Sequence, residues 1–458
     1  MSRRGRSKPR ALIISPTREL AEQLAEEARK VAARTGVIVE TAVGGTRKNV
    51  GLARIHRFGC DVLIGTPGRL SDLLSMGPEF GIDMPDLGTL VLDEADRLLD
   101  DGFWPEIRNI LSYLPEREDV DRQTLLFSAT APAEVMDVVR DSLKPGYKFI
   151  KTVRDDEVPT HMKVPQKVVW MNGFENALPT VLDIAKTYMR DQSQTQPFKA
   201  IVYFNTTAEV ELAEELFSNL VVSPELGYPL GRRLQIYGLQ SRLTQAKRTM
   251  NSDGFRKASS AILFSSSLTA RGMDFPNVTH VIQVGLPRTR PDYIHRIGRT
   301  GRADKSGQAW LLLVDGLGSL EKVYRSRLGD LPIETANIKP ANVDLTEKGA
   351  LDTSPSCSQV KQAMASVPNA SKAIAYRALS NQATELGNSV TAKRKLQDLL
   401  VYGYGLTGFQ ANTTFRDRPK SRPPQFRDSN RFADRYDGHR GRGRGQLSSL
   451  RYMYGDNF

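Results

Sequence analysis

The stretch "ALIISPTREL", residues 11 to 20, contains an apolar run that ends abruptly at Pro16, and a helical pattern follows from Arg18. An apolar run that leads directly into a helix is typical of a buried strand in a parallel sheet. Such a strand normally lies inside its sheet, after earlier strands and crossovers. Because only ten residues precede it, we expect a first domain that is truncated at its N-terminal side.

The same alternation continues to about Lys151. Further strands are predicted over residues 37–43, 61–66, 89–96, 123–130 and 148–153, with helices between them, as over 21–35 and 134–143. Alternating strands and helices predict a parallel sheet that is covered on both faces. Polar or small residues follow each strand, at the edge where open α/β sheets bind their ligands.

A second alternating series begins after a segment with two prolines and mixed charge. Its strands are predicted over residues 167–172, 199–206, 233–238, 260–267, 279–285 and 307–314. The predicted fold class is therefore α/β, with two parallel-sheet domains. The predicted parts are a first domain (1–151), a linker (152–166), a second domain (167–330), a helical C-terminal extension (331–410) and a disordered tail rich in Arg and Gly (411–458).

The formal net charge of +12 favours polyanionic partners, above all nucleic acid, although excess charge also serves solubility. Residues 411–458 hold 11 basic and 5 acidic side chains, a net +6, so half of the excess lies in about a tenth of the chain. This segment interleaves Arg with Phe and Tyr, which suits non-specific RNA binding through charge and stacking. A solubilising tail with no partner is the alternative.

Other features of the sequence exclude several classes of protein. Cys60 and Cys357 are the only cysteines, too few for a disulfide framework or a zinc site. No apolar run reaches the ~18 residues that a membrane helix needs, so no membrane partner is expected. The basic start "MSRRGRSKPR" is compatible with a mitochondrial transit peptide and equally with a solvated terminus, and it assigns no location.

The octamer "TLVLDEAD", residues 89 to 96, delivers Asp93 and Glu94 to the end of an apolar strand. One carboxylate at this edge can hold Mg²⁺ through water, and the next can orient or deprotonate an attacking water. Acidic residues at a helix start explain a single such Asp equally well. Taken alone, the octamer leaves both interpretations open.

This octamer is one of a series of motifs that occur in a fixed order. They are "PTRELA" (16–21), "GG" (44–45), "TPGR" (66–69), "DEAD" (93–96), "SAT" (128–130), "YFNT" (203–206), "TQAKR" (244–248), "ARGMDFPNV" (270–278) and "YIHRIGRTGR" (293–302). Over roughly residues 11–330 the set closely resembles the DEAD-box family of ATP-dependent RNA helicases, within helicase superfamily 2. "RGMDFPNV" and the basic helical region after it are most similar to fungal mitochondrial members, which favours a mitochondrion by resemblance only.

The resemblance implies two RecA-like domains, ATP and Mg²⁺ as cofactors, and RNA as a largely sequence-independent partner. Asp93 would hold the metal and Glu94 would be catalytic, while Ser128 and Thr130 would couple the nucleotide site to RNA. Arg299 and Arg302 would be arginine fingers, which contribute ~10³–10⁵ in rate in related systems. Asp274 would reach the ribose, and His295 would bridge to the first domain. The implied RNA contacts are Thr17, Arg18, Gly44, Gly45, Thr66, Pro67, Gly68, Arg69, Thr206 and Ser266.

Two departures from the family pattern bear on function. The 458 residues contain no Gly-Lys dipeptide, whereas the family has a Gly-Lys-Thr phosphate loop (the Walker A loop) before "PTRELA". That loop carries most of the phosphate binding, so we expect this chain alone to be a poor ATPase. Ser266 and Ser267 stand where the family usually has Thr-Asp. Ser267 therefore lacks a carboxylate that would pair with an arginine such as Arg296.

Three functional hypotheses follow. The first is an ATP-dependent RNA helicase or RNA chaperone that unwinds short duplexes. The second is a catalytically inactive, helicase-like protein that holds RNA through its second domain and tail. The third is a related superfamily 2 motor that acts on DNA, which the combination of "PTRELA", "DEAD" and "HRIGRTGR" disfavours.

Overall fold

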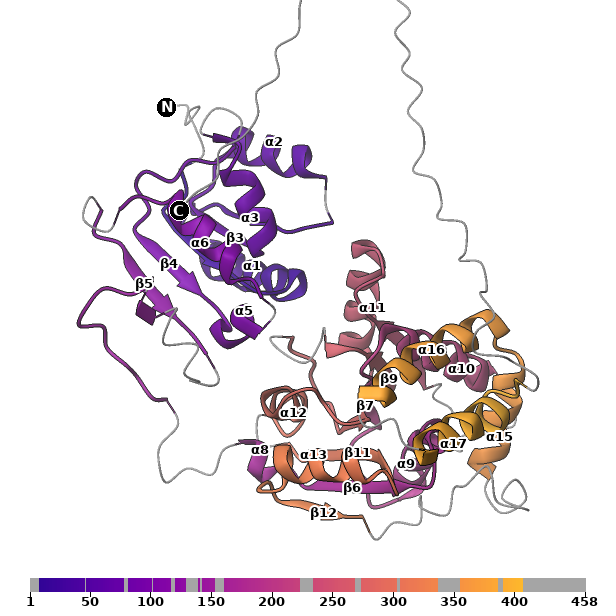
Figure 1. The fold of residues 1–458 in the computed structure, drawn as a ribbon. Coiled ribbons are helices and arrows are strands. Elements are labelled where there is room, and N and C mark those ends of the chain that lie inside the picture. The colour runs from indigo at the N-terminus through magenta and orange to yellow at the C-terminus, as the bar shows by residue number, and fades with distance from the viewer. Residues whose placement is uncertain are drawn as a thin grey trace, which may run out of the picture. The chain divides into compact units, whose positions relative to one another are not determined.

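The computed structural model describes residues 8–45, 47–77, 81–100, 102–116, 120–128, 139–140, 142–152, 160–222, 234–267, 273–302, 305–336, 355–385 and 390–406. These residues form two parallel sheets, each with helices packed on it, as Figure 1 shows. In this part of the chain no helix combines the length and apolar character needed to cross a membrane. The predicted disordered tail, 411–458, lies outside the described residues.

The central strand of the first sheet is formed by the apolar run at residues 11–14. Strand β1 (Ala11–Ile14) pairs in parallel with β3 on one side and with β4 on the other, in the order β2-β3-β1-β4-β5. The other strands are β2 (Val39–Ala42), β3 (Val62–Gly65), β4 (Thr89–Leu92) and β5 (Gln123–Leu126). The helices are α1 (Arg18–Ala32), α2 (Lys48–Phe58), α3 (Pro67–Leu74), α5 (Ala95–Asp100) and α6 (Trp104–Ser112). The predicted interior position of β1 is confirmed.

Side chains of β1 alternate between the two faces of this sheet, as the strand period of two requires. Leu12 and Ile14 have no exposed surface and belong to one core, which helices α3 and α6 complete with leucines and isoleucines. Ile13 points to the other face, where Ala21 and Ala25 of α1 pack against the sheet. The small alanines let α1 approach the sheet closely.

The predicted strand over residues 148–153 is wrong. Residues 148–152 have no regular structure, and Phe149 and Ile150 are 74% and 76% exposed. An apolar β-branched run becomes a strand only when a neighbouring strand accepts its hydrogen bonds, and no described strand does so here. Strand β5 has only exposed and half-buried residues, and β4 is its only partner among the described residues. The helix predicted over 134–143 falls largely outside the described residues.

The second sheet contains all six predicted strands, in the order β12-β6-β11-β10-β7-β9-β8. Its strands are β6 (Gln166–Met171), β7 (Lys199–Tyr203), β8 (Gln235–Leu239), β9 (Ala261–Ser265), β10 (His280–Val284), β11 (Gln308–Val314) and β12 (Ile333–Thr335). Strand β12 lies in the region predicted to be helical, and it pairs with the edge of β6. The helices of this part are α8 (Thr160–Lys163), η1 (Phe174–Asn176), α9 (Ala177–Arg190), α10 (Thr207–Val222), α11 (Gln245–Lys257), α12 (Arg290–Ile297) and α13 (Gly318–Leu328). Helix α8 shows that the C-terminal end of the predicted linker has regular structure.

The C-terminal helices share the hydrophobic core of the second sheet. They are α15 (Pro355–Ala365), α16 (Asn369–Glu385), α17 (Val390–Asp398) and the π-helical turn η5 (Leu399–Gly403). Helix α15 packs on α9 and α10, and α16 packs on α10. Val360, Met364 and Leu396 are buried in the same core cluster as the sheet. The predicted C-terminal helices are therefore confirmed, and they cover part of the apolar core of the second sheet.

Candidate active site and nucleic-acid interface

The turn that carries Asp93 and Glu94 is fastened to strands on both of its sides. The Asp93 backbone N–H donates to Ile14 O of β1 at 3.0 Å, and the Ala95 N–H donates to Phe127 O beyond β5 at 3.0 Å. Two neighbouring strands therefore fix the direction in which the carboxylates leave β4. Both carboxylates therefore lie at the carboxyl ends of the strands, where open α/β sheets bind their ligands.

Glu94 has an unusual backbone conformation for a residue with a side chain. Its φ is +49°, in the left-handed region, which costs of order 1–3 kcal/mol unless the surroundings impose it. The surroundings do so here, because the Arg97 and Leu98 N–H groups both donate to Glu94 O at the start of α5. Strain of this kind is concentrated at functional sites.

Burial raises the pKa of both carboxyl groups. For Glu94 the charges of Arg97 and Arg299 act in the opposite direction and favour the carboxylate. A carboxylate with a raised pKa is a better proton acceptor than an exposed one. Arg299 belongs to the second domain's "HRIGRTGR" motif, so the charge of one predicted catalytic residue acts on another that lies about 200 positions away in the chain.

Arg299 is held by its own domain. Its Nη1 donates to Met273 O at 2.5 Å and its Nε donates to His295 O at 3.3 Å. Burial, and then the charge of Arg302, lower its pKa to about 10, so it stays protonated at neutral pH. The guanidinium is thus charged, desolvated and oriented, as a phosphate-binding group requires.

Arg302 and Asp274 form an ion pair. Arg302 Nη1 lies 2.6 Å from Asp274 Oδ1, and its Nε donates to Gly298 O at 2.7 Å. Both side chains are partly exposed, at 35% and 62%. The predicted finger and the predicted ribose contact therefore hold each other in this structure, and the pair would have to open before both could meet a nucleotide.

His295 lies beside the "DEAD" motif, and its predicted bridging role stays a prediction. Its Nε2 lies 3.7 Å from Asp96 Oδ2 of the "DEAD" motif, and both side chains are buried. The imidazole therefore lies beside the last carboxylate of that motif, although 198 intervening residues separate them in the sequence.

Three of the predicted RNA contacts, Gly44, Gly45 and Arg18, lie close together. A Cβ at Gly44 would lie 2.7 Å from Arg18 Nη2, and one at Gly45 would lie 2.5 Å from Nη1. Gly45 also has φ +78°, which favours glycine. The two glycines thus leave room for the Arg18 guanidinium over the backbone. Thr17 Oγ1 accepts the Leu20 N–H at 3.3 Å as the N-cap of α1, so its hydroxyl has a structural task.

The "TPGR" residues form the start of a helix rather than a plain turn. Thr66 and Pro67 are buried at the N-terminus of α3, where proline at the first position is preorganised. Gly68 is exposed, with open space where a Cβ would be, and the Arg69 Nε lies 4.0 Å from Asp72 Oδ2. Backbone N–H groups of a first helical turn suit phosphate contacts.

The remaining predicted contacts differ in their hydrogen bonds and in their exposure to solvent. The Thr206 hydroxyl donates to Glu209 Oε2 at 2.7 Å and accepts the Glu209 N–H at 3.1 Å, so it caps the N-terminus of α10. Ser266 is half-buried after β9, and Ser128 is exposed after β5. Thr130 lies outside the described residues. The RNA and coupling roles of these residues stay predictions.

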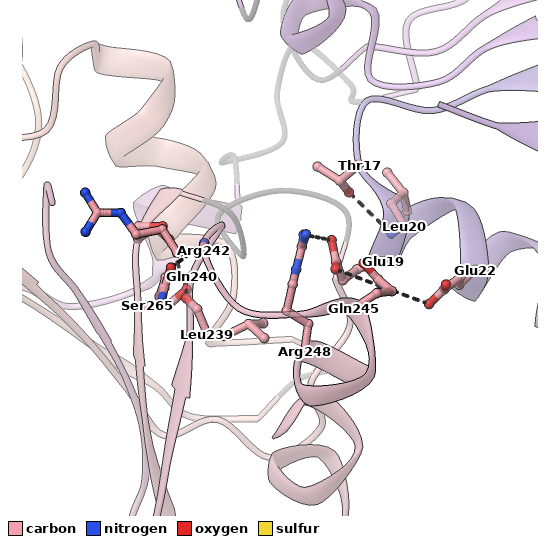
Figure 2. Close-up of polar contacts among 11 residues, drawn as sticks. Thr17, Glu19, Leu20, Glu22, Leu239, Gln240, Arg242, Gln245, Arg248 and Ser265 are labelled. Carbon is pink, nitrogen blue, oxygen red and sulfur yellow. Dashed lines mark hydrogen bonds and ion pairs between the residues drawn. The ribbon is translucent and has the colours of Figure 1, made fainter. Parts of the chain in front are cut away.

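A buried ion pair between α1 and α11 was missed as a functional feature, although both residues belong to recognised motifs. Arg248 Nη2 of "TQAKR" lies 2.6 Å from Glu19 Oε2 of "PTRELA", and the side chains are only 6% and 4% exposed (Figure 2). Gln245 Nε2 adds contacts to Glu19 Oε1 at 3.3 Å and to Glu22 Oε2 at 3.5 Å. The sequence did not indicate this contact, because Glu19 and Arg248 are ordinary polar residues of two helices that lie far apart in the chain.

Glu19→Ala and Arg248→Ala should each destabilise the chain strongly, because either one leaves its partner's charge buried without compensation. Such losses are about 3–5 kcal/mol. The double variant should lose less than the sum of the two, giving a coupling of about 1–3 kcal/mol in a double-mutant cycle measured by urea unfolding. Additive effects would mean that the pair is not formed in solution.

Comparison with protein-family models places both halves of the chain in one class. The model for the DEAD/DEAH box helicase matches residues 1–138, and the model for the helicase conserved C-terminal domain matches residues 180–304. Fold, motif order and carboxylate site thus agree with these two family models. Together the matches cover more than half of the chain, which belongs to the DEAD-box family.

Two fungal relatives show which members the chain resembles. It is 52% identical over 411 residues to the mitochondrial ATP-dependent RNA helicase mss116 of Aspergillus fumigatus, a match that covers 87% of this chain and 61% of the relative. It is 45% identical over 403 residues to the mitochondrial ATP-dependent RNA helicase cyt-19 of Neurospora crassa, covering 87% and 62%. The chain therefore spans about three fifths of the length of these relatives.

Solved structures agree with the fold. Mss116p bound to single-stranded RNA and AMP-PNP has a TM-score of 0.63 at 26% identity, over 85% of this chain and 76% of that one. Mss116 bound to single-stranded RNA and UDP-BeF has a TM-score of 0.65 at 26% identity, over 87% and 76%. The fold prediction of two RecA-like α/β domains is confirmed.

Proposed function

We propose that this chain is the motor portion of an ATP-dependent RNA helicase that binds RNA without regard to sequence and separates short duplexes. The observation that carries the proposal is that "HRIGRTGR" lies against the "DEAD" motif, with His295 Nε2 3.7 Å from Asp96 Oδ2, so that the charge of Arg299 acts on Glu94. A carboxylate and a desolvated arginine from two domains are the groups that phosphoryl transfer needs on opposite sides of a nucleotide. The mitochondrial names of two relatives support a mitochondrial location.

The residues present fit Mg²⁺ and part of a nucleotide site. The described residues contain no group of three His, Cys, Asp or Glu side chains suited to a metal. Mg²⁺ commonly takes one or two carboxylates, with phosphate oxygens and waters completing its shell, so Asp93 alone is sufficient. Arg299 and Arg302 would contact the phosphates of ATP, and Asp274 would contact the ribose. The 458 residues supply no Gly-Lys-Thr for the phosphates themselves.

RNA binding tests the part of the proposal that this chain carries by itself. Arg18→Ala should weaken the affinity for a fluorescein-labelled ten-nucleotide oligo(U) about tenfold, because one charged phosphate contact is lost. The slope of log K against log salt should fall by about 0.7. Fluorescence anisotropy at several salt concentrations measures both quantities.

Arg57→Ala is the matched control for this prediction. Arg57 is exposed at the end of α2, before the N-terminal end of β3, whereas Arg18 follows the C-terminal end of β1. It should leave the affinity and the salt slope close to those of the unchanged chain. Equal effects of both variants would contradict a defined RNA track at Arg18, and tighter binding to the matching oligo(dT) would favour the DNA hypothesis.

A catalytically inactive RNA-binding protein is the second candidate, and Ser267, where the family usually has an aspartate, favours it. The two candidates differ in whether Glu94 and the arginines work once a phosphate loop is supplied. A fusion of this chain to a Gly-Lys-Thr segment from a DEAD-box relative decides between them, by its RNA-stimulated ATP hydrolysis.

A further inference from the structure

Arg296, in the last turn of α12, is a buried charge. It is 1% exposed, and burial lowers its pKa, although an arginine stays protonated in a protein. Burying a charged group is costly unless a partner of opposite charge or strong hydrogen bonds compensate it. The buried positive charge of Arg296 therefore needs a compensating partner.

Its hydrogen-bond partners are neutral and distant. Arg296 Nη2 donates to Ser267 Oγ at 3.2 Å and to Asn205 Oδ1 at 3.4 Å, and Nη1 donates to Gln283 Oε1 at 3.5 Å. The Tyr203 ring centroid lies 5.2 Å from its Cζ. Charge-assisted hydrogen bonds are about 2.7–2.9 Å long, so none of these contacts has that strength.

The carboxylate of Asp292, four residues earlier in α12, favours the charge of Arg296 from a distance but forms no ion pair with it among the described residues. The buried Nε has no hydrogen-bond partner, and within the described residues no carboxylate oxygen lies within 4 Å of this guanidinium. Arg248 gives the contrast, because it is also buried but has Glu19 at 2.6 Å. The charge of Arg296 is thus only partly satisfied by dipoles.

Two of the neighbouring groups determine where an additional partner could bind. Asn205 Nδ2 donates to Leu286 O at 2.9 Å, which fixes its amide so that Oδ1 faces Arg296. Ser267 is exposed, two residues beyond the end of β9, and its hydroxyl lies directly against Nη2. A ligand that displaces or joins this hydroxyl would reach the guanidinium from solvent.

We propose that Arg296 and Ser267 form an oxyanion site that takes a phosphate oxygen, supplied by an RNA phosphodiester or by free phosphate. Arginine matches the geometry of phosphate, and the serine hydroxyl can donate to a second oxygen of the same group. The site goes beyond the proposed function, in which Arg296 has no role. An aspartate at position 267 would fill it with a fixed charge and close it.

The test compares Ser267→Asp with two other variants of the full 458-residue chain. Ser267→Ala removes one of the two groups of the site but adds no charge, so its response to phosphate should lie between those of the unchanged chain and Ser267→Asp. Ser259→Asp adds the same charge at an exposed serine before β9, at the opposite end of that strand. Thermal unfolding in inorganic phosphate, against chloride at equal ionic strength, reports free phosphate, and anisotropy with ten-nucleotide oligo(U) reports RNA.

Phosphate should raise the melting temperature of the unchanged chain and of Ser259→Asp most, that of Ser267→Ala less, and that of Ser267→Asp least. The general stabilisation by phosphate cancels in this comparison. If RNA is the source, Ser267→Asp should also bind oligo(U) about tenfold more weakly than Ser259→Asp, with a salt slope smaller by about 0.7. Loss of the phosphate response alone would assign the site to free phosphate.

The proposal is overturned if the two aspartate variants respond equally to phosphate and bind RNA equally. Because the phosphate measurement needs no RNA, it remains decisive even if the unchanged chain binds no oligo(U). That result would contradict the proposed function without bearing on this site. Ser267→Asp is expected to fold, since the new carboxylate would pair with a buried arginine.

Discussion

Fusing a Gly-Lys-Thr segment from a DEAD-box relative to the N-terminus of this chain should raise RNA-stimulated ATP hydrolysis at least about a hundredfold over the 458-residue chain alone. Removing a single preorganised donor costs roughly 10²–10³ in rate, and the unmodified chain lacks the family's loop sequence altogether. Within the fusion, Glu94→Gln should return hydrolysis to background, because the buried carboxylate that is the predicted proton acceptor is lost. Release of inorganic phosphate with and without RNA measures both effects.

Glu26→Gln in the same fusion is the matched control. Glu26 lies on the exposed face of α1, where its Oε1 pairs with Lys30 at 3.2 Å, and the change removes one charge as Glu94→Gln does. It should leave the rate unchanged. Robust turnover by the unmodified chain would contradict our interpretation of the missing loop, whereas an inactive but folded fusion would favour the RNA-binding hypothesis.

Leu12→Ala should destabilise the first sheet by about 3–5 kcal/mol and leave the second sheet almost unaffected. Leu12 has no exposed surface in the central strand, and its loss leaves a cavity between the sheet and the helices of that core. The second sheet has separate core clusters, so the defect should stay local. Hydrogen exchange with peptide resolution, at increasing denaturant, reports the stability of β1 and β9 in one experiment.

Leu263→Ala is the reciprocal variant, because Leu263 is equally buried but lies in β9 of the second sheet. It should accelerate exchange in the second sheet and spare β1. If either variant weakened both sheets by the same amount, the two domains would unfold as one cooperative unit. The Glu19–Arg248 contact would then be the first feature to examine as the source of that cooperativity.

Most of the fold could be predicted from the sequence because its signals are local. An apolar run of four to seven residues followed by a helix start identifies a parallel strand without knowledge of its neighbours. The central position of β1 and all six predicted strands of the second sheet are confirmed. The predicted strand over 148–153 failed because a strand also needs a partner, and the three-residue strand β12 was missed because it is too short to show a pattern.

The candidate site was predictable to a lesser extent. Motif order pointed to Asp93, Glu94 and Arg299, and the structure adds the strained φ of Glu94 and the approach of His295 to Asp96. Thr206 shows the limit, because the same hydroxyl that suggests a phosphate contact also caps α10. Residue type alone does not distinguish these two uses.

The sequence by itself determined the family, the α/β class and the order of the motifs, because each depends on residues that are neighbours in the chain. Tertiary structure alone decided which side chains meet. Glu19 pairs with Arg248 although 228 residues lie between them, and Arg296 is buried against Ser267 with no carboxylate of the described residues in direct contact. The energy of a charge depends on its surroundings in space, so its partners, and the oxyanion site that we infer from them, become visible only in the folded chain.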